Sequence, residues 1–181
     1  MSIKGFFIIE NEPLFKAEKE LDESIVKRIT EQFTYSKNEL IDDNYVLAFK
    51  QLTEIAVKAM SPGINDPGTA LNAIDYLSEL FVLRLQKSDY SYTCVDDTVW
   101  VSISTVNFST LLFQVMASLR TYCKKDITVG QRIIKMLLFL KKTSSNKQYT
   151  KAIEEELNRF KEDINHAIIN TDDLNILNQL F

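Results

Sequence analysis

The segment from Ser61 to Pro67 reads Ser-Pro-Gly-Ile-Asn-Asp-Pro and combines polar and turn-forming residues. This order fits the end of one helix and the start of another, where free backbone N–H groups attract anions. An anion could bind there, or Asp66 could fill the position as a helix cap. Asp75 follows slightly over two turns later and could pair with Arg120. We predict a ligand or partner site, with a purely structural junction as the alternative, at Ser61, Asn65, Asp66, Thr69, Asp75 and Arg120.

Catalytic and metal-binding patterns are weak in the rest of the chain. His166 is the only histidine, so no second histidine completes a zinc or iron site, and we interpret it as a solvated helix residue. The four glycines are scattered and form no phosphate-binding loop. We predict no catalytic residue, no metal and no cofactor. An enzyme that uses Asp66 and Asp75 with a divalent metal is the weakest hypothesis.

The composition narrows the class of protein. The chain of 181 residues has 21 basic and 25 acidic residues and a net charge of −4, which disfavours nucleic acid as a partner. Cys94 and Cys123 lie far apart and outside any CxxC pattern, so we expect reduced thiols. No signal peptide is evident, and no apolar run reaches the roughly 18 to 20 residues that span a bilayer. We therefore expect a soluble, cytoplasmic chain, membrane-associated where upstream transmembrane segments exist in the natural protein.

Two helices must position the Ser61–Pro67 segment. Apolar residues at helical spacing predict a helix that ends just before Pro62, because a proline disfavours helical backbone in the residue before it. Gly63 is expected to supply a left-handed or tight-turn residue after this helix. Asp66 as cap and Pro67 as first helical residue then begin a second helix.

The remaining segments predict a mostly α fold. Turn-flanked β-branched and aromatic residues predict short hairpins at 3–17 and 88–104. Helical spacing predicts an amphipathic helix at 22–34 and three or four helices after residue 105. We predict a single domain over 1–181, a helical bundle with one or two small peripheral hairpins. Its parts are a hairpin region at 1–20, helices around the segment at 21–87, a hairpin at 88–104 and C-terminal helices at 105–181.

One stretch resembles the signature of a known family. Residues 52–70 read LTEIAVKAMSPGINDPGTA, which is similar to the pattern L-x-x-I-A-x-R-A-L-S-P-G-I-N-D-P-x-T-A of a bacterial predicted membrane protein family, domain of unknown function number 2254. Residues 5–14 and 119–122 show weaker similarity to two further family segments, and Lys58 replaces the family's arginine. The resemblance implies a domain related to the soluble part of a membrane protein, and it implies no particular reaction.

Two functional hypotheses follow for this chain. The first is a non-enzymatic regulatory or ligand-sensing domain, associated with a membrane protein or derived from one, that binds an unknown small ligand or protein at the predicted polar site. The second is a module that self-associates as a homo-oligomer through exposed apolar residues such as Trp100, Phe181 and the second hairpin.

Overall fold

The computed structural model describes residues 7–35, 41, 44–89, 91–96, 98–103 and 105–181, and within them it has seven helices and one two-stranded sheet. The mostly α fold predicted from the sequence is confirmed. The chain forms two compact units, residues 1–47 with 90–105 and residues 48–89 with 106–181. The first unit holds α1 (Glu23–Thr30), β1 (Ser91–Val95) and β2 (Thr98–Ile103). The second holds nearly all of α2 (Val46–Ala59) and all of α3 (Pro67–Leu85), α4 (Phe108–Cys123), α5 (Ile127–Thr143), α6 (Lys147–Ala167) and α7 (Thr171–Asn178).

The N-terminal part of the first unit differs from its prediction. A turn is present where expected, with Asn11 at φ 70° and the Glu12 N–H donating to the carbonyl of Ile9 at 3.0 Å. Residues 14–17 are not in a strand, so the returning strand predicted there is wrong, and residues 1–6 lie outside the described part. A two-stranded hairpin is marginal without a covered apolar face, and the charged run that begins at Lys16 gives this one little to bury.

The second predicted hairpin is confirmed as β1 and β2. The strands pair antiparallel, with Thr93 opposite Val101 and Cys94 opposite Val99. Trp100 is therefore an extra residue in β2, which makes a β-bulge and breaks the alternation of side chains at that position. The prediction that the Trp100 side chain faces away from its two neighbours concerns a side chain outside the described part.

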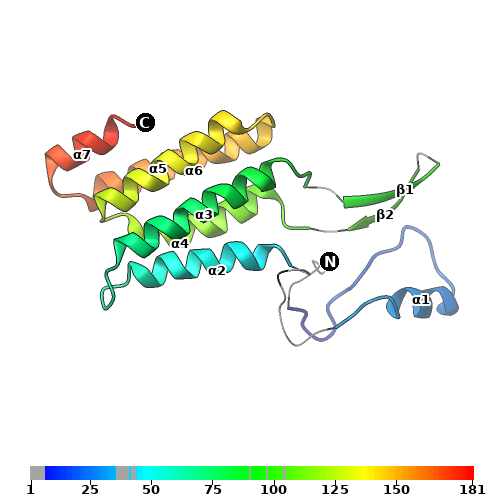
Figure 1. Ribbon diagram of the computed structural model, residues 1–181. Coiled ribbons are helices and arrows are strands. Elements are labelled where there is room, and N and C mark those ends of the chain that lie inside the picture. Colours follow the sequence, from blue (N-terminus) through cyan, green and yellow to red (C-terminus); the bar gives the residue numbers. More distant parts are fainter. Residues whose placement is uncertain (1–6, 36–40, 42–43, 90, 97, 104) are drawn as a thin grey trace. The chain divides into compact units, whose positions relative to one another are not determined.

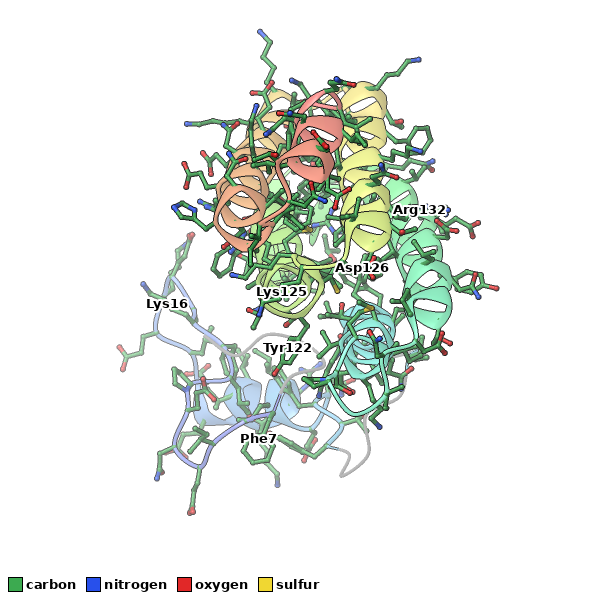
Figure 2. All side chains as sticks on the ribbon, turned by 90° about the vertical axis from the view of Figure 1, so that its left-hand side faces the viewer. Phe7, Lys16, Tyr122, Lys125, Asp126 and Arg132 are labelled. Carbon is green, nitrogen blue, oxygen red and sulfur yellow. The ribbon has the colours of Figure 1, made fainter. Side chains whose placement is uncertain are left out.

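The helices of the second unit begin where local capping allows. In each of five helices an Asn or Asp side chain accepts a hydrogen bond from a backbone N–H of the first turn, which otherwise has no partner within the helix. Figure 2 shows one of these caps, Asp126, at the turn between α4 and α5. The five capping residues are Asp66 for α3, Asn107 for α4, Asp126 for α5, Asn146 for α6 and Asn170 for α7.

The core of the second unit lies among long helices that run side by side (Figure 1). Helix α3 packs on α5, and α6 packs on both α4 and α5. A row of aromatic rings connects four helices, from Phe49 through Phe81 and Phe108 to Tyr149, with centroids 4.8, 6.1 and 4.6 Å apart. Each such contact stabilises the fold by about 0.5 to 1.5 kcal/mol beyond the contribution of the apolar area that it buries. The largest fully buried side chains include Phe81, Phe108, Phe160, Ile74, Leu77, Leu111, Leu112, Met116, Leu119, Ile133, Ile134 and Leu137.

A buried arginine joins the end of α3 to the start of α4. Arg84 forms an ion pair with Asp89 and donates to the carbonyls of Lys87 at 3.1 Å and Val106 at 3.2 Å. The Asp89 carboxylate also accepts the backbone N–H of Phe108 at 2.8 Å. These bonds hold together the two chain segments on either side of residues 90–105.

A tyrosine of α6 completes this cluster. The Tyr149 hydroxyl donates to the Lys87 carbonyl at 3.2 Å, and the Arg84 guanidinium lies 5.9 Å from the centre of the Tyr149 ring. Burial raises the pKa of the Tyr149 phenol, so it stays neutral and keeps its proton for this hydrogen bond.

We predict that Arg84→Ala lowers the free energy of unfolding by about 3 to 5 kcal/mol, because it leaves the Asp89 charge buried without its partner. Arg132→Ala is the control, since it removes an ion pair to Asp75 in which the side chains are 40% and 48% exposed. The control should lose less than about 1 kcal/mol. Urea unfolding followed by circular dichroism measures both values. Equal losses in the two variants would contradict the structural role given to Arg84.

The two cysteines should differ sharply in reactivity. Both are free, Cys94 exposed on β1 and Cys123 buried at the end of α4. Burial raises the pKa of the Cys123 thiol to about 12, and the nearby Asp126 charge adds to the effect. We predict that Ellman's reagent modifies one thiol per native chain at pH 8 and two after unfolding, because only the thiolate reacts. Rapid modification of both thiols in the native protein would contradict this placement.

Candidate functional site

The Ser61–Pro67 junction is a closed turn held by its own backbone. The Asp66 N–H donates to the carbonyl of Ala59 at 2.8 Å, which ties the start of α3 to the end of α2. The N–H groups of Ile64 and Asn65 both donate to the carbonyl of Ser61 at 3.0 Å. The chain therefore passes from α2 to α3 in one defined conformation.

The polar side chains of the junction also find local partners. The Ser61 hydroxyl donates to the carbonyl of Lys58 at 2.7 Å, at the end of α2. The Asp66 carboxylate accepts the Thr69 hydroxyl at 2.5 Å and the Thr69 N–H at 3.1 Å. These two hydrogen bonds from Thr69 hold the pKa of the Asp66 carboxyl below its ordinary value. Capping of α2 and α3 accounts for all three polar side chains.

The left-handed residue of the junction is Asn65, while Gly63 lies in a tight turn, which was the other conformation expected for it. Asn65 has φ 47°, whereas Gly63 has no positive φ and a Cβ added to it would meet no atom within 4 Å. Asparagine tolerates left-handed backbone better than other residues with a Cβ, so it can take the position that was expected for glycine. The Asn65 side chain is exposed and makes no hydrogen bond to another described residue.

Substitutions at Asn65 and Gly63 test which of the two residues adopts the left-handed backbone conformation. We predict that Asn65→Ala lowers the free energy of unfolding by about 1 kcal/mol, while Asn65→Gly keeps or raises stability, because only glycine adopts positive φ freely. Gly63→Ala should be neutral or slightly stabilising, since its backbone and surroundings accept a methyl group. Thermal and urea unfolding measure all three. A larger loss for Gly63→Ala than for Asn65→Ala would overturn this assignment.

The other two predicted site residues are held by different partners. Asp75 pairs with Arg132 of α5, and Arg120 pairs with Glu156 and Asp163 of α6, so the expected Asp75–Arg120 pair is wrong. Figure 2 shows Arg132 on α5. The pairing follows from which helices pack together, because α3 lies on α5 and α4 lies on α6. The structure brings Ser61, Asn65, Asp66 and Thr69 together in the junction and gives Asp75 and Arg120 partners outside it.

Arg120 belongs to an ionic cluster built around a buried carboxylate. The Glu156 residue is 1% exposed and accepts hydrogen bonds from the guanidinium groups of both Arg120 and Arg159. Both guanidinium groups also lie near the Phe113 ring, 5.8 and 5.7 Å from its centre. Ion pairs with the buried Glu156 carboxylate and contacts with the Phe113 ring hold both arginines in place.

Glu156 and Arg159 are not among the site residues predicted from the sequence. A signal was present, because Glu156 interrupts a helical stripe of apolar residues that includes Ile153 and Phe160. A carboxylate at a core-facing position must find a cationic partner. Arg159, three residues later on the same helix, is within reach of it.

An open hollow of about 350 Å³ adjoins this cluster, lined by Arg120, Arg159, Glu162, Asp163 and His166. Asp163 pairs with Arg120 and with Lys124, each at 3.2 Å. His166 is exposed, as predicted, and its Nδ1 lies 2.6 Å from the carbonyl of Glu162. The hollow therefore presents fixed charges of both signs on α4 and α6.

Metal binding finds no support in the described residues. Within 7–35, 41, 44–89, 91–96, 98–103 and 105–181, no group of three or more His, Cys, Asp or Glu side chains is placed to hold a metal ion. The two carboxylates of the weakest hypothesis are each engaged, Asp66 with Thr69 and Asp75 with Arg132.

These features define a helical-bundle domain whose sequence carries a β-hairpin between α3 and α4. None of the helices in the described ranges has the length and apolar character needed to cross a bilayer. The chain belongs to the family Predicted membrane protein (DUF2254), whose model matches residues 2–138. The match ends within α5, so α6 and α7 lie beyond it. No curated protein and no solved structure matches the chain.

Proposed function

We propose that this chain is a non-enzymatic regulatory domain that senses a small zwitterionic ligand in the hollow between α4 and α6. The observation that carries the proposal is the open hollow itself, whose walls hold guanidinium and carboxylate groups around the buried Glu156. Fixed polar groups in a concave site give a small-molecule site its orientation and specificity.

The charges of the hollow fit a ligand with both an anionic and a cationic group. Arg120 uses Nη1 for Glu156 and Nε for Asp163, while Nη2 has no partner among the described residues. The Glu162 carboxylate forms no ion pair with another described side chain. A ligand carboxylate would bind the arginines, and a ligand ammonium would bind Glu162. The arginines are already held in place, which reduces the entropy lost on binding.

The same proposal places the domain in the cytoplasm as a regulatory part or associate of a membrane protein. The family description supports the link to a membrane protein. The free thiols of Cys94 and Cys123 support a reducing compartment, because disulfides are rare there.

A thermal-shift panel tests the ligand. We expect free L-amino acids to raise the melting temperature by about 3 °C or more at saturating concentration, because ligand binding to the folded state alone stabilises it. Acetate and methylammonium, which carry one charge each, should give no shift at equal ionic strength.

Arg159→Gln should abolish the shift, because it removes one guanidinium from the hollow. Arg132→Gln is the matched control, since its ion pair on α3 and α5 is also half-exposed and should leave the shift intact. An unchanged melting temperature with every L-amino acid in the panel would overturn the proposed ligand class, and loss of the shift in both variants would overturn the proposed location.

A further inference from the structure

Positive charge is concentrated in one stretch of this acidic chain. Residues 127–153, which cover α5 and the first turns of α6, contain six of the chain's 21 basic residues and none of its 25 acidic ones. A block of one charge in a chain of the opposite net charge is typical of a surface that attracts a charged partner. The packing of the helices decides whether these cations lie together.

The helices bring most of these cations to one end of the bundle. Lysines at the end of α5 and the start of α6 lie near each other, because only residues 144–146 separate the two helices. The end of α3 reaches the same place, since the carbonyl of Lys87 accepts the hydroxyl of Tyr149. Five exposed lysines form this cationic end, namely Lys87, Lys141, Lys142, Lys147 and Lys151.

Most of the cationic end has no counter-charge in the described part of the chain. Lys141 pairs with Glu154 at 2.9 Å, and the carboxylate of Asp89 is engaged with Arg84. The other four lysines form no ion pair with another described side chain. Their positive charge therefore faces solvent and can attract an anionic partner.

Two exposed apolar side chains lie beside the cationic end. Helices α3 and α5 run in the same direction, and the ion pair between Asp75 and Arg132 sets their register (Figure 1). Two turns after this pair come Leu83 on α3 and Phe139 on α5, which are 57% and 54% exposed. Lysines with exposed apolar side chains among them are the combination that binds a bilayer surface, because the cations attract anionic headgroups and the apolar groups enter the acyl boundary.

The type of cation favours a lipid surface over a site for one particular anion. All five residues of the cationic end are lysines, whose ammonium groups are point charges on flexible stems. Sites that recognise a single phosphate or carboxylate favour arginine, because its planar guanidinium binds two oxygens at once. The description of the family, Predicted membrane protein, is in keeping with a bilayer as the partner.

We propose that the cationic end binds the surface of a bilayer that contains anionic lipids, with Leu83 and Phe139 at the acyl boundary. Each lysine near such a surface strengthens binding by about a factor of five, so the association is reversible and additive over the cluster. The hollow between α4 and α6 lies toward the other end of α6, so lipid binding does not depend on a ligand there.

Co-sedimentation of the full chain with vesicles tests the surface without any variant. We expect binding at 0.05 M NaCl to vesicles of phosphatidylcholine and phosphatidylserine, and binding about tenfold weaker or less to phosphatidylcholine alone. At 0.5 M NaCl, binding to the anionic vesicles should also fall about tenfold or more, because the Debye length shortens from over 10 Å to a few Å.

A pair of charge reversals locates the binding surface. Lys142→Glu combined with Lys147→Glu should weaken binding to the anionic vesicles about twentyfold or more, because it removes two cations and adds two anions. Lys58→Glu combined with Lys125→Glu is the matched control. It makes the same change in net charge at two exposed lysines near the other end of the bundle, at the end of α2 and in the turn after α4, and should weaken binding less than about threefold.

The apolar contribution has its own variant. Phe139→Ala should weaken vesicle binding several-fold at either salt concentration and leave the melting temperature nearly unchanged, because the side chain is half-exposed in the folded chain.

No binding to anionic vesicles, equal binding to phosphatidylcholine alone, or equal weakening by the two double variants would each overturn the proposal. Retention on poly-L-glutamate or polyuridylate without binding to vesicles would assign the cationic end to a protein or a nucleic acid and overturn it as well.

Discussion

The buried guanidinium of Arg84 needs a counter-charge and hydrogen-bond acceptors, because an unpaired charge at that depth costs several kcal/mol. Asp89 supplies the charge, and the carbonyls of Lys87 and Val106 accept further bonds. All three lie just after α3 or just before α4, so satisfying one side chain fixes how the chain leaves one helix and enters the next. The packing of α4 on α6 then follows from this start, since Phe108 at the first position of α4 stacks on Tyr149 of α6.

Much of this fold is predictable from the sequence because the determining chemistry is local. Helix starts at Asp66 and Asp126 depend on a side chain that caps its own first turn, so residues a few positions apart contain the whole signal. The hairpin at 88–104 is likewise defined by alternation and a turn. The N-terminal hairpin failed as a prediction because a strand pair also needs an apolar face to bury, and alternation over a few residues does not show one.

The candidate site was harder to predict because its partners are set by helix packing. Asp75 and Arg120 have compatible charges, yet the register of α3 on α5 gives Asp75 to Arg132. Glu156 lies within a stripe of apolar residues, where helical periodicity alone assigns a hydrophobic core. Of its two cationic partners, Arg159 is three residues away on the same helix, but Arg120 lies on another helix, so the sequence of α6 alone predicts only part of the cluster. The left-handed backbone of Asn65 was also not predicted, since Gly63, two residues earlier, is the residue type that adopts positive φ most readily.

The hydrogen bond between the Asp89 carboxylate and the Phe108 N–H, 2.8 Å long, has a topological meaning. It joins the two points where the chain departs from the bundle and comes back to it, so loop closure at this site is already achieved without residues 90–105. The entropy of closing a loop grows only slowly with its length. The bundle therefore fixes both ends of this loop itself, and we expect it to accept segments of other lengths and sequences between Asp89 and Phe108 while the helices keep their order.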